Sequence, residues 1–119
     1  VRRMTAAELD TALRRLDAEG VPGVCVTPRY RLRHFVWGPA GGVPLVFVHG
    51  MNDLPRSFAP VMARLVDAGV RCVGYHLPDG AGDGANLGMY RHRHFVADLV
   101  ALLDHMREPV ADLFGSSFG

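Results

Sequence analysis

A serine between two glycines is the residue of this sequence best placed to act as a nucleophile. The segment Gly115 to Gly119 fits the pattern G-x-S-x-G, in which Ser117 and not Ser116 holds the central position. The segment follows the short apolar run 110–114, which predicts a buried strand. A sharp turn from a strand into a helix lifts such a hydroxyl off the sheet edge, and the flanking glycines let the backbone pass close. We therefore expect Ser117 to attack a substrate.

The elements that must position this serine can be read from the hydrophobic pattern. Thr5 and Glu8 form a capping box, and apolar residues at helical spacing then predict an N-terminal helix over 6–19, ended by Gly20. Runs rich in β-branched and aromatic residues predict strands, of which the first two are expected to be antiparallel neighbours. The further elements expected are strands 23–27, 30–37, 45–48, 70–75 and 110–114, a helix capped by Ser57 and closed by Gly69, a glycine-rich loop 77–88, and a helix 91–106.

This alternation of strands and helices predicts an α/β fold with a mostly parallel sheet and helices on both faces. The length of 119 residues suits a single domain over 1–119, with the helix 6–19 followed by core strands and helices over 22–119. The run 45–48 is continuously apolar, as expected for a strand that is covered on both faces.

The order of these landmarks resembles the N-terminal half of an α/β-hydrolase of the serine-nucleophile branch, ending at the nucleophile elbow. The resemblance covers about 22–119 and is carried by the strand ending in His49-Gly50, by Leu77-Pro78 with the glycines after it, and by Gly115 to Gly119. It implies an α/β-hydrolase-like fold that is incomplete at its C-terminal side. After the fourth strand the family often has Asp-x-Pro-Gly, whereas this chain has His76-Leu-Pro-Asp79.

The resemblance also implies a role for each residue of the site. Ser117 would be the nucleophile, and the backbone N–H groups of Met51 and Phe118 would form the oxyanion hole, each donor being worth about 2.7–4 kcal/mol of barrier. His49 would prop its loop, and Gly50 would let the backbone approach the substrate. Gly115 and Gly119 would shape the elbow. The structural alternatives are a turn serine at Ser117 and a core-filling side chain at Met51.

The resemblance places the catalytic acid and base after later strands, in the order Ser, acid, His. Neither position lies within 1–119, since Asp112 falls inside a predicted strand and His49 precedes the nucleophile on another turn. We therefore expect a C-terminal half of the fold as a partner, in the same chain or in a separate one. Residues 1–119 alone are expected to be inactive.

The function implied is a serine hydrolase that cleaves a small carboxylic ester through an acyl-enzyme, with no metal or cofactor. Serine at the elbow argues against the branches that use aspartate there, the dehalogenases and epoxide hydrolases. It leaves open esterase, lipase, thioesterase, peptidase, carbon–carbon hydrolase, acyltransferase and cofactor-free peroxidase. The alternative is a catalytically silent fragment or pseudoenzyme that needs a partner segment to fold.

Composition gives little support to other partners. The 13 arginines and 12 acidic residues are spread along the chain and leave a net charge of +1, so no nucleic-acid partner is indicated. No apolar stretch approaches the roughly 20 residues that span a bilayer, and we expect a cytoplasmic protein without membrane contact. Cys25 and Cys72 fall in predicted strands, as buried thiols do.

Two further motifs are candidate binding sites. Arg91 to His94 suggests a metal or phosphate site, although a solvated first helical turn explains it more simply. Gly80 to Ala85 matches the dinucleotide-binding pattern G-x-G-x-x-A, but it lacks a helix that opens directly after the glycines and an acidic residue at the end of a following strand.

Overall fold

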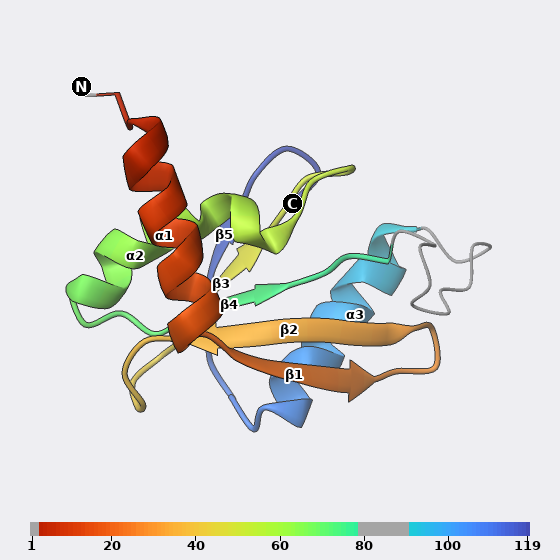
Figure 1. Ribbon diagram of the computed structural model, residues 1–119. Helices are drawn as coiled ribbons and strands as arrows, with labels where there is room; N and C mark the ends of the chain where they lie inside the picture. Colours follow the sequence, from red (N-terminus) through yellow and green to blue (C-terminus); the bar gives the residue numbers. More distant parts are fainter. Residues whose placement is uncertain (1–2, 79–90) are drawn as a thin grey trace.

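The computed structural model describes residues 3–78 and 91–119, which form a mixed sheet with helices on both faces (Figure 1). The predicted α/β architecture is therefore confirmed. The elements are α1 (Ala6–Glu19), β1 (Val21–Val26), β2 (Arg31–Trp37), β3 (Leu45–Val48), the 3-10 turn η1 (Pro55–Phe58), α2 (Ala59–Asp67), β4 (Cys72–Tyr75), α3 (His92–His105) and β5 (Asp112–Gly115).

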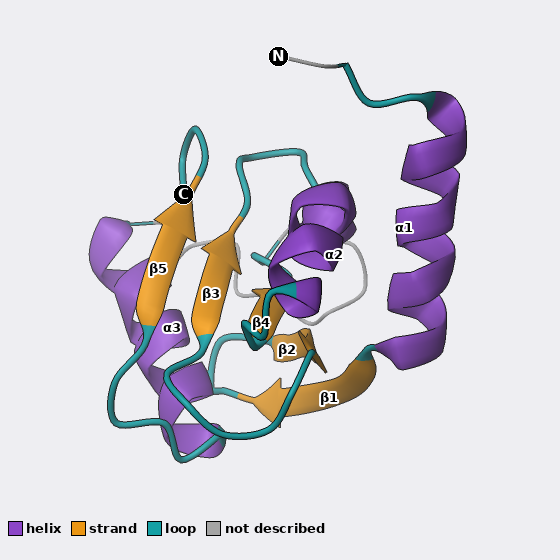
Figure 2. Cartoon of the chain, turned by 90° about the vertical axis from the view of Figure 1, so that its left-hand side faces the viewer, coloured by secondary structure: helices purple, strands orange, loops and turns teal. Residues whose placement is uncertain are grey.

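The strand order in the sheet is β1-β2-β4-β3-β5. β1 pairs with β2, and β2 with β4, in antiparallel fashion, whereas β3 is parallel to both β4 and β5. In the β3–β5 pair Val48 lies opposite Gly115, so both strands end at the same edge of the sheet (Figure 2). The His49-Gly50 segment and the G-x-S-x-G segment therefore leave the sheet side by side.

The two faces of the sheet carry separate apolar clusters. Helices α1 and α2 cover one face, where Trp37, Phe47 and Met62 are almost fully buried. Helix α3 covers the other face, where Val46 and Leu102 are buried (Figure 2). The neighbours Val46 and Phe47 thus face opposite sides, as the alternation of side chains in a strand requires. Burial on both faces explains why β3 is apolar throughout.

Several expected boundaries are met, and one expected cap is wrong. Helix α1 occupies 6–19, with the Thr5 hydroxyl accepting from the Glu8 amide at 3.1 Å. Ser57 does not cap α2, because it lies inside η1 and donates to Asp53 Oδ1 at 2.5 Å, while α2 begins at Ala59. Proline occupies the first turn of both η1 and α2, where its missing N–H has no cost.

The glycine-rich loop expected over 77–88 and the dinucleotide-like pattern Gly80 to Ala85 fall almost entirely outside the described residues. Cys25 and Cys72 are buried free thiols, and burial raises the pKa of Cys72 to about 11. Within the described ranges, none of the helices is long and apolar enough to cross a membrane.

Candidate active site

The turn after β5 holds Ser117 in an unusual backbone conformation. Ser117 has a φ of 56°, in the left-handed region that costs a residue with a Cβ roughly 1–2 kcal/mol. Two hydrogen bonds fix the turn around it: Ser116 N–H donates to the Val48 carbonyl at 3.1 Å, and Gly119 N–H donates to the Ser116 carbonyl at 3.0 Å. A strained serine at the end of a parallel strand is what a nucleophile elbow contains.

The two motif glycines are required by close backbone contacts. A Cβ on Gly115 would collide with the carbonyl group of Gly119, and a Cβ on Gly119 would collide with the Val48 carbonyl. Both obstacles are backbone atoms, which cannot rotate away as a side chain does. The elbow is therefore packed against the end of β3, and only glycine fits at either position.

The turn after β3 lies directly against the serine. A Cβ built on Gly50 would lie 3.1 Å from the Ser117 Cβ and 3.6 Å from its Oγ. The turn is closed by a hydrogen bond from Asp53 N–H to the Gly50 carbonyl at 3.2 Å, with Asn52 at a φ of 61°. Glycine at position 50 therefore lets the two turns approach each other closely.

His49 is buried and held by the backbone at both ring nitrogens. Its Nε2 accepts from the Leu77 amide at 3.0 Å, and its Nδ1 lies 2.7 Å from the Gly50 carbonyl oxygen. Because an amide only donates and a carbonyl only accepts, the ring must be neutral with its proton on Nδ1. His49 therefore fixes the direction of the Gly50 carbonyl and has no nitrogen left for proton transfer to Ser117.

The two amides expected to form an oxyanion hole belong to Met51 and Phe118. Among the described residues, neither Met51 N–H nor Phe118 N–H has a hydrogen-bond partner. The Met51 side chain is 52% exposed, so it is not a core filler. The Phe118 ring packs edge-on against Phe95 at 4.8 Å and stacks on His92 at 5.7 Å between ring centroids. Within residues 3–78 and 91–119, the Ser117 hydroxyl has no hydrogen-bond partner that could act as its base.

A cavity of about 440 Å³ opens beside Met51, at the ends of β3 and β4. Asp53 brings a carboxylate to it, and the Ser57 hydroxyl and the Leu54 amide hold the pKa of that carboxyl below its usual range. The cavity is lined by His49, Met51, Asn52, Asp53, Leu54, His76, Leu77 and Pro78. The cavity therefore adjoins Met51 but is not lined by Ser117 or Phe118.

The sequence matches no protein-family model and no curated protein. Solved structures do match: epoxide hydrolase A from Mycobacterium thermoresistibile at a TM-score of 0.74 and 27% identity, and an epoxide hydrolase from Vigna radiata at 0.74 and 25%. The carboxylesterase CesB from Bacillus subtilis matches at 0.77 and 18% identity. The chain has an α/β-hydrolase fold.

The α/β-hydrolase resemblance expected from the sequence is thus confirmed for the part of the fold that this chain supplies. The matches cover 84%, 86% and 94% of this chain, but only 32%, 32% and 39% of the respective structures. The chain spans about a third of the length of these hydrolases.

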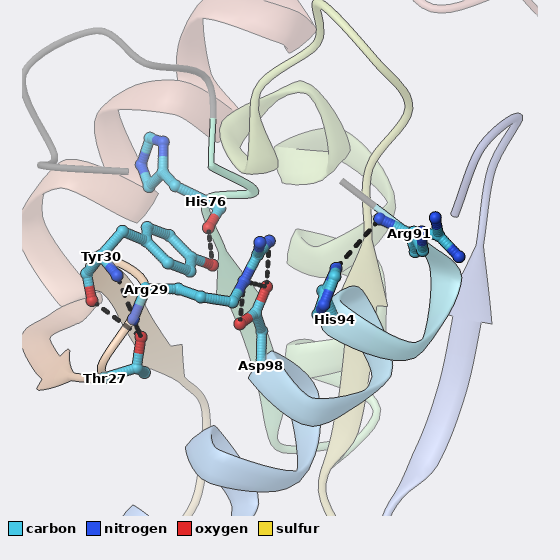
Figure 3. A network of polar contacts seen from close by, with 7 residues as sticks. All are labelled: Thr27, Arg29, Tyr30, His76, Arg91, His94 and Asp98. Carbon is cyan, nitrogen blue, oxygen red and sulfur yellow. Dashed lines mark hydrogen bonds and ion pairs between the residues drawn. The ribbon is translucent and has the colours of Figure 1, made fainter. Parts of the chain in front are cut away.

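The first turn of α3 is closed by a hydrogen bond between two of its own residues. Arg91, at the N-cap, donates its backbone N–H to His94 Nδ1 at 3.1 Å (Figure 3), while His92 and Arg93 are exposed. Burial, followed by the nearby arginines, lowers the pKa of His94. Within 3–78 and 91–119, no cluster of three or more His, Cys, Asp or Glu side chains could hold a metal ion.

Tyr30 and the ion pair beside it are not among the residues that the sequence predicts for the site. The Tyr30 hydroxyl donates to the His76 carbonyl at 2.8 Å, and Arg29 forms a buried ion pair with Asp98 at 2.9 Å (Figure 3). These contacts join residues 46 and 69 positions apart in the chain, respectively. No local sequence pattern predicts these contacts, because they depend on how β2 pairs with β4 and on how α3 packs against the sheet.

Proposed function

We propose that this α/β-hydrolase is a serine hydrolase that cleaves a carboxylic ester through an acyl-enzyme on Ser117. The observation that carries the proposal is the left-handed φ of 56° at Ser117, in a turn packed against Gly50. The Ser117 Oγ would attack the ester carbonyl carbon, and its proton would pass to a base. The Met51 and Phe118 amides would donate to the oxyanion of the tetrahedral intermediate, where preorganised donors lower the barrier most.

The acyl-enzyme then follows from ordinary acyl transfer. The intermediate collapses, the alcohol leaves with the proton returned by the base, and water hydrolyses the acyl-serine. We propose that the base histidine and its acid come from the C-terminal half of the fold, in the same chain or in a separate one. His49 is not a candidate, because both of its ring nitrogens are occupied by backbone groups.

Serine at the elbow favours an ester over an epoxide, although epoxide hydrolases are among the matching structures. The epoxide-opening branch has an aspartate there, whose carboxylate needs no deprotonation before it attacks. A serine hydroxyl needs a base to attack and suits a carbonyl carbon, where the oxyanion hole can act. We further propose the cytoplasm as the compartment, because Cys25 and Cys72 are free buried thiols.

The test uses the full-length protein and a fluorophosphonate probe, with the adduct mapped by mass spectrometry. We expect labelling at Ser117, complete loss of labelling in Ser117→Ala, and a fall of several orders of magnitude in p-nitrophenyl ester hydrolysis by that variant. Ser116→Ala is the matched control and should keep both the fluorophosphonate labelling and the ester hydrolysis of the wild type. An adduct on Ser116, or unchanged labelling of Ser117→Ala, would refute the assignment.

A further inference from the structure

A continuous series of hydrogen bonds runs from Tyr30 to the peptide that bears the Met51 amide. The Tyr30 hydroxyl donates to the His76 carbonyl at 2.8 Å (Figure 3), and the N–H of the same peptide, that of Leu77, donates to His49 Nε2 at 3.0 Å. On the other side of the ring, His49 Nδ1 donates to the Gly50 carbonyl at 2.7 Å. The N–H of that second peptide belongs to Met51.

Every donor in this series points the same way. The carbonyls of His76 and Gly50 can only accept, and the Leu77 amide can only donate, so no step can be reversed. In each of the two peptides the carbonyl and the N–H are on opposite sides of a trans bond, and none of the described peptides is cis. Within the described part of the chain, the Met51 N–H is therefore the free end of one polarised series.

We propose that Tyr30 is a positioning residue for the oxyanion hole, acting through the His76–Leu77 peptide and His49 on the direction and strength of the Met51 N–H donor. This inference rests on the proposed function, in which Met51 N–H binds the oxyanion.

The surroundings make this series effective. Tyr30, His49 and Leu77 are only 3%, 5% and 4% exposed, so each hydrogen bond is little screened by water. In such a medium successive hydrogen bonds polarise one another, which strengthens the last donor. Glycine at position 50 gives the Gly50–Met51 peptide freedom to flip, and a flip would turn the Met51 N–H away from the oxyanion of the proposed mechanism. The Nδ1–H of His49 opposes that flip by holding the Gly50 carbonyl, at a shorter distance than the Asp53 N–H that donates to the same oxygen.

The turn before β2 keeps the Tyr30 ring in place. Thr27 Oγ1 accepts from the amides of Arg29 and Tyr30, both at 3.1 Å, and donates to the Tyr30 carbonyl at 3.0 Å. The Arg29 side chain is anchored in turn by the Asp98 carboxylate on α3 (Figure 3). The turn that carries the Tyr30 hydroxyl, the first donor of the series, is therefore held in place by these hydrogen bonds.

The test is Tyr30→Phe in the full-length protein, which removes the hydroxyl and keeps the ring. We expect kcat for an ester to fall about three- to tenfold with KM unchanged, the effect of losing part of one hydrogen bond in the transition state alone. In nuclear magnetic resonance spectra, the protons of Leu77 N–H, His49 Nδ1–H and Met51 N–H should all move upfield. Tyr75→Phe is the matched control: Tyr75 is 1% exposed on the neighbouring strand and outside the series, so kcat and these three signals should stay unchanged.

The outcomes separate this inference from the proposed function. If Tyr30→Phe leaves the His49 Nδ1–H and Met51 N–H signals where they are in the wild type, the inference is wrong, whatever the activity. A rise in KM with kcat unchanged would also refute it, since that pattern means lost substrate binding. If the wild type cleaves no ester and takes no fluorophosphonate, the proposed function fails, and the signals still decide whether Tyr30 controls the Met51 amide.

Discussion

At the scale of single residues, the Met51 amide offers the sharpest test of the oxyanion hole, because its role uses the backbone and its side chain is 52% exposed. Met51→Pro deletes the N–H and should lower kcat by about 10²–10³, the usual effect of losing one oxyanion donor. Met51→Leu keeps the donor and should stay within about twofold of the wild type, since an exposed apolar swap disturbs little. Steady-state ester hydrolysis by the two variants, with circular dichroism to confirm folding, makes the comparison. Equal activity of both would remove Met51 from the mechanism.

Gly119 should not tolerate a larger residue, because its backbone lies too close to neighbouring backbone atoms. A Cβ there would collide with the Val48 carbonyl and lie 3.0 Å from the His49 carbonyl oxygen, so Gly119→Ala must displace the elbow. We expect a loss of about 1–3 kcal/mol in the free energy of unfolding, with a strong loss of esterase activity. Gly41→Ala is the control: its φ of 89° adds strain, but no atom lies within 4 Å of the added carbon. Urea unfolding should show both variants destabilised, and only Gly119→Ala should lose activity.

At the scale of elements, the Arg29–Asp98 ion pair fastens α3 to the β1–β2 turn. Both side chains are buried, at 6% and 2% exposure, and Arg29 also lies over the Phe95 ring at 5.3 Å. Asp98→Asn removes the carboxylate charge that pairs with this buried guanidinium and should cost about 3–5 kcal/mol of unfolding free energy.

The exposed pair Arg14–Asp10 gives a matched control for that measurement. Its side chains are 80% and 59% exposed, so Asp10→Asn should cost less than about 1 kcal/mol. Urea denaturation of the two variants under the same conditions compares them directly. A cost at Asp98 no greater than that at Asp10 would mean that the buried pair does not hold the helix to the turn.

The elements that the sequence predicted best are those with local signals at both ends. Helix α1 has a cap at Thr5 and a stop at Gly20, and its bounds were predicted correctly. The strand expected from Val70 begins at Cys72, because the Val70 amide is taken by the Leu65 carbonyl at 2.9 Å, at the end of α2. Strand β1 begins earlier than expected, at Val21, since an edge strand tolerates proline at position 22.

The same distinction between local signals and long-range contacts applies to the candidate site. The elbow and the His49-Gly50 turn are short motifs that lie next to strand ends, so the sequence located them. The hydrogen bonds that orient them are long-range: Tyr30 reaches His76 only because β2 and β4 pair with His34 opposite Tyr75. A single sequence carries no register for that pairing, and so it could not reveal Tyr30.

At the scale of the whole molecule, buried histidine should make stability depend on pH. Burial, and to a smaller degree the charge of His105, lowers the pKa of His34 below its usual 6.5. The folded state therefore binds this proton less readily than the unfolded state. The stability that neutral His34 contributes to the folded state is complete above pH 6.5. It is lost as the pH falls towards the lower pKa of the folded state. His34→Leu should flatten the decline in unfolding free energy between about pH 7 and 5, measured by urea titration. An unchanged slope would show that His34 does not contribute to it.

The outer edge of β5 leads to the last prediction, which concerns the molecule as an assembly. β5 pairs only with β3 in the described sheet, and Leu113 and Phe114 remain 57% and 46% exposed. A flat apolar edge with unpaired amides favours pairing with another strand. We propose that the C-terminal half of the fold covers it, so residues 1–119 expressed alone should self-associate and show no esterase activity. Sedimentation at several concentrations tests this, and Leu113→Lys, which charges the edge, should reduce the association. A wild-type 1–119 that stays monomeric, unfolds cooperatively and turns over ester would contradict the proposal, because it would need neither a covering strand nor a base from elsewhere.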